Sequence, residues 1–202
     1  MTTPRDLVIT ALDVASTHPV EQGELSLALA GAELIDLLGA GLATLDGDRI
    51  MPGQWGETAD RLLDQAAASL VGEAPYESVD DWLWRRGRDL APAYLAALEA
   101  QGLLTRRRRR WTPFRTGERA LVESVDRRQA GERWAAREPV LAALAQTVGI
   151  GGNETVAAPG DEIGGAVETV LAAVGEAALE LEAVRQRRAI EQAAFDNVWR
   201  GD

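Results

Sequence analysis

The segment that follows Gly23 is too apolar to lie on the surface of a folded protein. Alanine, glycine and leucine fill most of the positions between its large apolar residues. Those residues recur at helical spacing and are Leu25, Leu29, Leu34, Ile35 and Leu38. A helix that is apolar around most of its circumference is buried among other elements. We therefore predict that this segment forms a central helix, and that the rest of the chain packs around it.

Amphipathic patterns predict the surrounding helices. One begins at Thr3, with Pro4 in its first turn, and a short one begins after Ser78 and holds Trp82 and Trp84. Longer helices are predicted at about residues 57–71, 89–101 and 117–148, with further alanine- and glutamate-rich helices after residue 165. The predicted fold class is mainly α: central apolar helices ringed by amphipathic helices, with one or two β-hairpins.

Two segments have the pattern of a hairpin. Residues 42–45 and 49–51 flank Asp46-Gly47, a pair that suits a tight turn. Residues 103–105 and 110–112 flank a turn of arginines, after Gly102 ends the helix before them. A cluster of arginines cannot be buried unpaired, so this second tip must contact water or an anion.

Length and composition are typical of one domain. A chain of 202 residues with 46% apolar residues can bury a core without disulfides. We expect residues 1–202 to form a single domain. The glycine-rich run at 149–165 is the place where a C-terminal helical subdomain could begin.

Catalysis has little basis in the sequence. There is no cysteine, and the only histidine, His18, precedes a proline in a predicted loop. Carboxylate pairs such as Glu33 with Asp36 are ordinary in a chain with 32 acidic residues. The run Gly149-Ile150-Gly151 lacks the third glycine and the preceding strand of a dinucleotide site. We predict no enzyme activity, catalytic residue, cofactor or metal.

The strongest functional signal is a basic block in an acidic chain. From Trp82 to Arg119 ten arginines face three acids, a balance of +7. The whole chain carries −11, so the remainder carries −18. Five consecutive arginines, 106–110, run into Trp111 and, three residues on, Phe114. A local basic block beside aromatic residues, in a chain that otherwise repels polyanions, indicates one surface directed at an anionic partner.

An anionic membrane is the preferred partner. Arginine adds about 1 kcal/mol of attraction near an anionic leaflet, and aromatic rings suit the interfacial layer. The predicted membrane-inserting residues are Trp111 and Phe114. The predicted anion-binding residues are Arg88, Arg106, Arg107, Arg108, Arg109, Arg110 and Arg115. With no apolar run long enough to span a bilayer and no secretory signal, the expected location is cytoplasmic, peripheral on the inner face of the membrane.

Two alternatives remain open. The arginine turn can be solvated and paired with acidic groups of the same chain or of a second copy. It can also form the wing of a winged-helix nucleic-acid-binding regulator. A recognition helix needs polar readers, however, and the helix predicted at 89–101 is rich in alanine and leucine. We therefore expect no nucleic-acid partner.

Five sequence fragments, in order, resemble the Golgi phosphoprotein 3-like family in its short actinobacterial form. The resemblance covers roughly residues 5–180. The fragments are Asp6-Leu7-Val8-Ile9-Thr10-Ala11-Leu12-Asp13, Leu29-Ala30-Gly31-Ala32-Glu33-Leu34-Ile35-Asp36-Leu37, Leu62-Leu63-Asp64-Gln65-Ala66, Val79-Asp80-Asp81-Trp82-Leu83 and Leu98-Glu99-Ala100-Gln101-Gly102-Leu103-Leu104.

The resemblance implies a mostly helical domain that binds phosphatidylinositol 4-phosphate and uses its hairpin for membrane insertion and oligomerisation. It thus implies a lipid partner of the phosphatidylinositol type, a homo-oligomer formed through the hairpin, and a role as an adaptor or scaffold. Of the four headgroup positions in the family, one matches Arg88. The others fall near Glu21, at Ala30 and at Ala91, where this chain departs from the pattern.

Overall fold

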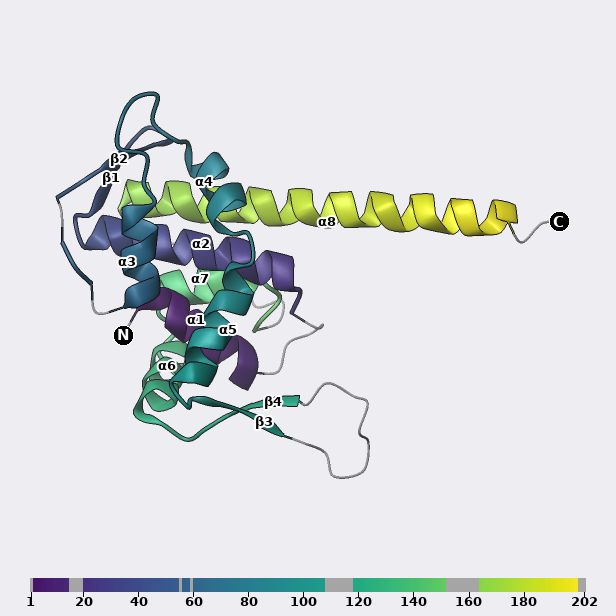
Figure 1. Cartoon of the computed structure of the whole chain (residues 1–202), viewed down its shortest axis with the longest axis horizontal. Coiled ribbons are helices and arrows are strands. Elements are labelled where there is room, and N and C mark those ends of the chain that lie inside the picture. Colours follow the sequence, from purple (N-terminus) through teal and green to yellow (C-terminus); the bar gives the residue numbers. More distant parts are fainter. Residues whose placement is uncertain are drawn as a thin grey trace.

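The computed structural model describes residues 2–14, 20–54, 56–58, 60–107, 118–151 and 164–199. Over these residues the chain is mainly helical with two small antiparallel hairpins, as predicted (Figure 1). In chain order the elements are α1 (Thr3–Asp13), α2 (Gln22–Gly39), β1 (Ala43–Asp46), β2 (Arg49–Pro52), α3 (Arg61–Ala68), α4 (Val79–Arg86), α5 (Leu90–Ala100), β3 (Leu104–Arg107), β4 (Glu118–Leu121), α6 (Val125–Ala135), α7 (Pro139–Thr147) and α8 (Gly165–Trp199).

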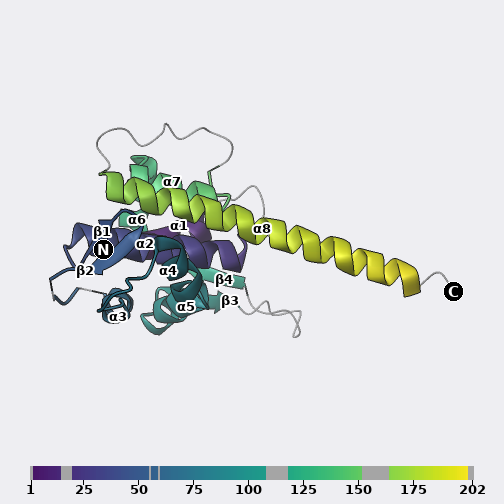
Figure 2. The ribbon, with the colours of Figure 1, turned by 90° about the horizontal axis from the view of Figure 1, so that it is seen from above.

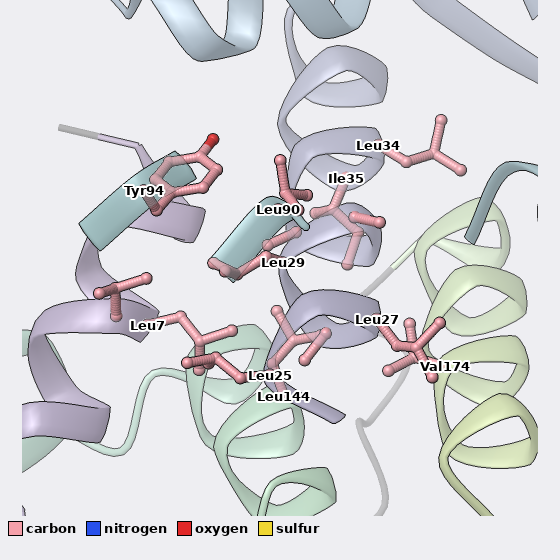
Figure 3. Packing of buried hydrophobic residues seen from close by; sticks show 14 of the residues in the cluster. Leu7, Leu25, Leu27, Leu29, Leu34, Ile35, Leu90, Tyr94, Leu144 and Val174 are labelled. Carbon is pink, nitrogen blue, oxygen red and sulfur yellow. The ribbon is translucent and has the colours of Figure 1, made fainter. Parts of the chain in front are cut away.

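Helix α2 is the centre of the fold, which confirms the prediction made from its apolar sequence. Helices α1, α3, α4, α5, α7 and α8 all pack against it. Leu29 and Leu34 are completely buried, and Leu25 is nearly so. Figure 3 shows side chains from four other helices gathered around α2. They are Leu7 of α1, Tyr94 of α5, Leu144 of α7 and Val174 of α8, all buried in the same cluster.

Helix α8 approaches α2 so closely that side chains are excluded from α2 at two positions. A Cβ atom added to Gly31 would lie 2.3 Å from Cγ2 of Val174, and one added to Gly23 would lie 2.7 Å from Cδ2 of Leu181. The residues after 165, expected to form more than one helix, form one helix of 35 residues. Its first half lies on α2, and its second half extends beyond the body (Figures 1 and 2).

A buried ion pair joins α2 to α4. The Nε and Nη2 atoms of Arg86 donate to the carboxylate of Glu33 at 2.7 and 2.9 Å, and the hydroxyl of Tyr94 donates to the same carboxylate at 3.0 Å. The side chain of Glu33 is fully buried, and burial raises the pKa of its carboxyl although Arg86 and Tyr94 both act to lower it. Glu33, expected to be an ordinary surface or capping acid, is instead the acceptor at the centre of this network.

The first hairpin is confirmed with a shift of one residue at its turn. Asp46 pairs with Arg49, so the turn residues are Gly47 and Asp48. Gly47 has a φ of 61°, a conformation that glycine adopts without strain.

The caps predicted around α4 and α5 are also confirmed. The hydroxyl of Ser78 accepts a hydrogen bond from the N–H of Asp81 at 3.0 Å at the start of α4. Gly102, with a φ of 72°, follows the end of α5.

The helix predicted at 57–71 is shorter, and the reason is side-chain capping. The carboxylate of Asp60 accepts the N–H of Leu62 at 2.8 Å, which starts α3 at Arg61. The carboxylate of Asp64 in turn accepts the N–H and hydroxyl of Thr58 at 2.6 and 2.7 Å. These bonds hold the preceding residues in a turn and remove them from the helix.

The helices predicted over 117–148 are confirmed except at the start of that range. Residues 118–121 form strand β4, because Leu121 pairs with Leu104 at the edge of the core. The remainder divides into α6 and α7 at Arg137, whose φ is 54°. The carboxylate of Glu138 then caps α7 by accepting the N–H of Leu141 at 2.9 Å, and Pro139 occupies the first turn.

We expect Arg86→Met to destabilise the fold by about 3 kcal/mol or more, because the buried carboxylate of Glu33 would lose its counter-charge. Arg49→Met is the matched control. Its ion pair with Asp48 is exposed on both sides, and its loss should cost less than about 1 kcal/mol. Chemical denaturation monitored by circular dichroism measures both values. Equal losses in the two variants would contradict the role given to Glu33.

The half-buried carboxyl of Asp36, on α2, predicts a pH dependence. Oδ2 of Asp36 accepts a hydrogen bond from the N–H of Thr3 at 2.7 Å. Burial nevertheless raises the pKa of the Asp36 carboxyl above its usual value of 3.8. A raised pKa favours the protonated folded form, so this contribution is complete below pH 3.8 and is lost as the pH rises through the folded-state pKa. Asparagine can keep the bond to Thr3 without a charge. Asp36→Asn should therefore gain stability over the wild type as the pH rises from 4 to 7, as measured by denaturation at each pH.

Candidate anion-binding site

The hairpin of β3 and β4 is tied to the core at its base. Leu104 pairs with Leu121 and is 5% exposed, and Leu121 packs on the core cluster. Backbone bonds continue on both sides: the N–H of Leu103 donates to the carbonyl of Leu98, and that of Val122 to the carbonyl of Leu103, each at 2.9 Å. The core therefore fixes the register of the hairpin from its apolar end.

The partner strand in this hairpin differs from the prediction. Residues 104–107 pair with β4 at 118–121, and the residues expected to pair with them, 110–112, lie outside the described residues. Pairing Leu104 with Leu121 joins two apolar residues at the core. Of the predicted site, Arg106 and Arg107 lie in β3. The other hairpin residues, Arg108, Arg109, Arg110, Trp111, Phe114 and Arg115, lie outside the described residues.

The observed register places two positive residues opposite each other. Arg106 of β3 is paired with Arg119 of β4, while Arg107 is paired with Glu118. Like charges at directly opposed positions of a two-stranded ribbon are unfavourable. Arg119 was counted in the basic block of the sequence but was not named as a site residue. Only the register, a long-range property, brings it to Arg106.

Arg88 lies in a different part of the surface, in the connection between α4 and α5. It is exposed, and the structure records no hydrogen bond or ion pair of its side chain with another described residue. A shallow groove of about 240 Å³ runs beside it. The principal lining residues are Gly23, Leu27, Trp84, Arg88, Pro92 and Leu181. The groove therefore combines one guanidinium group with a partly buried indole and an aliphatic floor.

The backbone at the start of α5 contributes no anion site to this groove. The N–H of Ala91 donates to the hydroxyl of Ser26 at 3.0 Å, and that of Leu90 donates to the carbonyl of Gly87 at 3.3 Å. Pro92 has no N–H, so the usual free donors of a helix N-terminus are occupied or missing. Recognition of an anion in this groove must depend on Arg88.

The unmatched headgroup positions of the resemblance lie where they cannot bind a ligand, apart from Glu21. Ala30 and Ala91 are completely buried, and the carbonyl of Ala30 accepts a hydrogen bond from the indole of Trp82 at 3.0 Å. Glu21 is exposed next to α2 and carries a negative charge. The aromatic residue of the groove is Trp84, which is half-buried and also packs against the core cluster.

The remaining sequence candidates give no chemical site. Among the described residues, no group of three or more His, Cys, Asp or Glu is arranged to hold a metal ion. Asp81 and Asp80 lie in the first turn of α4, where the carboxylate of Asp81 accepts from the hydroxyl of Ser78 at 2.7 Å. His18 lies outside the described residues. Helix α5, the element before the hairpin, exposes Ala96 and Ala100 and carries no arginine, which disfavours it as a recognition helix.

Comparison with known proteins identifies the family. The sequence model of the Golgi phosphoprotein 3 (GPP34) family matches residues 4–194, and the chain therefore belongs to this family. A search of curated proteins returned no match. In the parts of the chain that the structure describes, no helix combines the length and hydropathy that crossing a bilayer would require.

Proposed function

We propose that this member of the GPP34 family is a non-catalytic adaptor that attaches peripherally to an anionic bilayer. The proposed contact is the β3–β4 hairpin with its connecting residues 108–117, assisted by Arg88. The observation that carries the proposal is the Arg106–Arg119 pairing at the base of this connection. Two opposed positive residues destabilise the ribbon on their own. A phosphate group or another lipid anion beside them would remove that cost.

The charge distribution supports a directed approach to the membrane. The window from Trp82 to Arg119 sums to +7, and the rest of the chain to −18. An anionic surface therefore repels most of the molecule and attracts this part. Each arginine within a Debye length of about 8 Å contributes about 1 kcal/mol. Trp111 and Phe114, if inserted, supply the apolar half of the two signals that stable peripheral attachment requires.

The groove beside Arg88 limits how specific the attachment can be. A lipid headgroup of the phosphatidylinositol type would find one guanidinium, the indole of Trp84 and the negative charge of Asp89 at the groove. A single cation can bind one phosphate group but cannot distinguish a headgroup with one phosphate from a headgroup with several. We therefore infer that the protein senses the density of negative charge and only weakly distinguishes phosphatidylinositol-type lipids from phosphatidylserine. Attachment at the inner face of the membrane stays a prediction of the same proposal. Self-association through the hairpin stays a separate prediction, which sedimentation of the Arg108→Glu with Arg109→Glu variant tests.

Vesicle flotation tests the electrostatic half of the proposal. The variant Arg108→Glu with Arg109→Glu should lose at least about 2 kcal/mol of attraction, or about thirtyfold in partitioning, to phosphatidylcholine vesicles containing phosphatidylserine or phosphatidylinositol 4-phosphate. Arg61→Glu with Arg128→Glu is the matched control. These two arginines are exposed on α3 and α6, and the net charge changes equally. An equal loss of vesicle binding in both variants would show that only the net charge matters, and not the position of the arginines in the hairpin.

A nucleic-acid partner is the competing outcome. Binding of the wild type to random duplex DNA at physiological salt, without binding to anionic vesicles, would replace the membrane proposal by the winged-helix alternative.

The aromatic half has its own prediction. Trp111→Ala should weaken retention on anionic vesicles and leave the melting temperature nearly unchanged, because an inserting residue contacts lipid and not the core. Trp82→Ala is the contrasting control. Trp82 is completely buried, and its truncation should cost about 3–5 kcal/mol of stability. A fall in melting temperature for Trp111→Ala as large as that for Trp82→Ala would place Trp111 in the core.

A further inference from the structure

The outer face of α8 exposes apolar residues that no other described part of the chain covers. The inner face contacts the body through Val170, Val174 and Ala177, which are fully buried or nearly so. On the opposite face, Leu179 and Ile190 are 74% and 70% exposed, and Ala172 and Ala183 are exposed as well. Large apolar residues at such exposure on a helix that is already docked indicate a second contact.

The exposed stripe along this face has the spacing of a coiled-coil seam. Taken as alternating steps of three and four residues, it runs through Ala172, Glu176, Leu179, Ala183, Gln186 and Ile190, all exposed. This is the heptad spacing that brings two helices together along one line. Leu179 and Ile190 are the large apolar residues of the seam, and between them lie Ala183, which permits close approach, and Gln186. The seam begins on the body and continues into the half of α8 that extends beyond it (Figures 1 and 2).

Charge order along α8 selects the orientation of a second copy. From residue 165 to residue 184 the helix carries four acids, Glu168, Glu176, Glu180 and Glu182, and no base. The next four residues carry Arg185, Arg187 and Arg188. Two parallel copies would place the acidic segment of one helix beside the acidic segment of the other, and the basic segment beside the basic segment. Two antiparallel copies place the acidic half of one against the basic segment of the other, with opposed helix dipoles.

One register satisfies the apolar and the charged residues together. When Leu179 of one copy faces Ile190 of the other, Ala183 faces Gln186, and the flanking heptad positions bring Glu180 beside Arg187 of the second copy. The two-fold symmetry makes each of these contacts twice. Glu180 and Arg187 are exposed, and neither has a recorded ion-pair partner among the described residues. Arg185, by contrast, is already bound to Glu24 of α2 at 2.7 Å.

A groove next to the seam provides room for the second helix. A hollow of about 970 Å³ lies between α8 and the ends of α7 and α2. Val148, Ala178, Leu179 and Ala189 line it, together with Glu182. We propose that this chain forms an antiparallel dimer through the outer face of α8, with the extending half of each helix lying along the docked half of the other. This interface is separate from the hairpin and does not depend on lipid.

Charge reversal tests the interface on the full chain. Sedimentation velocity over a range of concentrations should show a monomer–dimer equilibrium for the wild type. Arg187→Glu should weaken dimerisation about tenfold, because two attractive pairs become repulsive. Adding Glu180→Arg should restore it. Arg188→Glu, one residue away and off the flank, is the matched control and should have the smaller effect. A wild type that stays monomeric, or a double variant that is not restored, overturns the proposal.

Disulfide cross-linking tests the orientation of the two helices. Because the chain has no cysteine of its own, only the introduced cysteines can form a disulfide. An equimolar mixture of Leu179→Cys and Ile190→Cys should form a disulfide dimer on oxidation. Each variant alone should not, because two identical positions would lie about 16 Å apart along the helices, beyond the reach of a disulfide. Efficient cross-linking of either variant alone shows a parallel pair and overturns the proposal. Both positions are exposed, so neither substitution removes a core contact.

Two further outcomes separate this dimer from the hairpin. The variant Arg108→Glu with Arg109→Glu should dimerise as the wild type does; loss of its dimer would show that the hairpin is the interface. A Leu179→Glu variant that reduces vesicle binding, in a protein that sediments as a monomer, would assign the stripe to lipid and equally overturn the proposal.

Discussion

The missing side chain of Gly31 determines how the molecule is assembled. Because α2 has only a hydrogen atom at this position, Val174 of α8 fits directly against the α2 backbone. Any larger residue would meet Cγ2 of Val174 at 2.3 Å, too close for a carbon atom. The contact brings α8 into the core, where Val170 and Ala177 are buried on the same side. It also sets the direction in which the free half of α8 leaves the body.

Helix α2 distributes polar and apolar contacts to different neighbours. Helix α8 packs against the glycines of α2. The carboxylate of Glu33 accepts hydrogen bonds from Arg86 of α4 and Tyr94 of α5, and that of Asp36 accepts one from the backbone N–H of Thr3 in α1. Glu33 and Asp36 lie among mostly apolar residues of α2, and each of these carboxylates accepts hydrogen bonds from a specific donor. Buried charge of this kind adds little net stability but excludes other registers, since a shifted helix would leave a carboxylate without its donor.

Local signals in the sequence predicted the parts of the fold that depend on local physics. The apolar circumference of α2, the cap at Ser78 and the glycine turn at Gly47 needed no knowledge of distant residues. The predictions failed where a distant partner decides the structure. Leu121 forms a strand because Leu104 holds it at the core, and Glu33 is buried because Arg86 lies within reach.

The candidate site divides in the same way. The charge of Arg88 is visible in the sequence, whereas its exposure and its position beside the groove are seen only in the fold. Trp84 in the groove and the Arg106–Arg119 pair could not be found from the sequence, since both depend on how elements pack or pair. Two of the three unmatched headgroup positions, Ala30 and Ala91, are completely buried, which accounts for their failure to transfer to this chain.

The β3–β4 hairpin and α8 lie on opposite sides of α2 in both views (Figures 1 and 2). Two chains joined along α8 would therefore direct their hairpins outward, away from each other. Under the proposed membrane contact, such a pair would act as a spacer that holds two separate lipid surfaces at a fixed distance, whereas a single chain has one hairpin to offer.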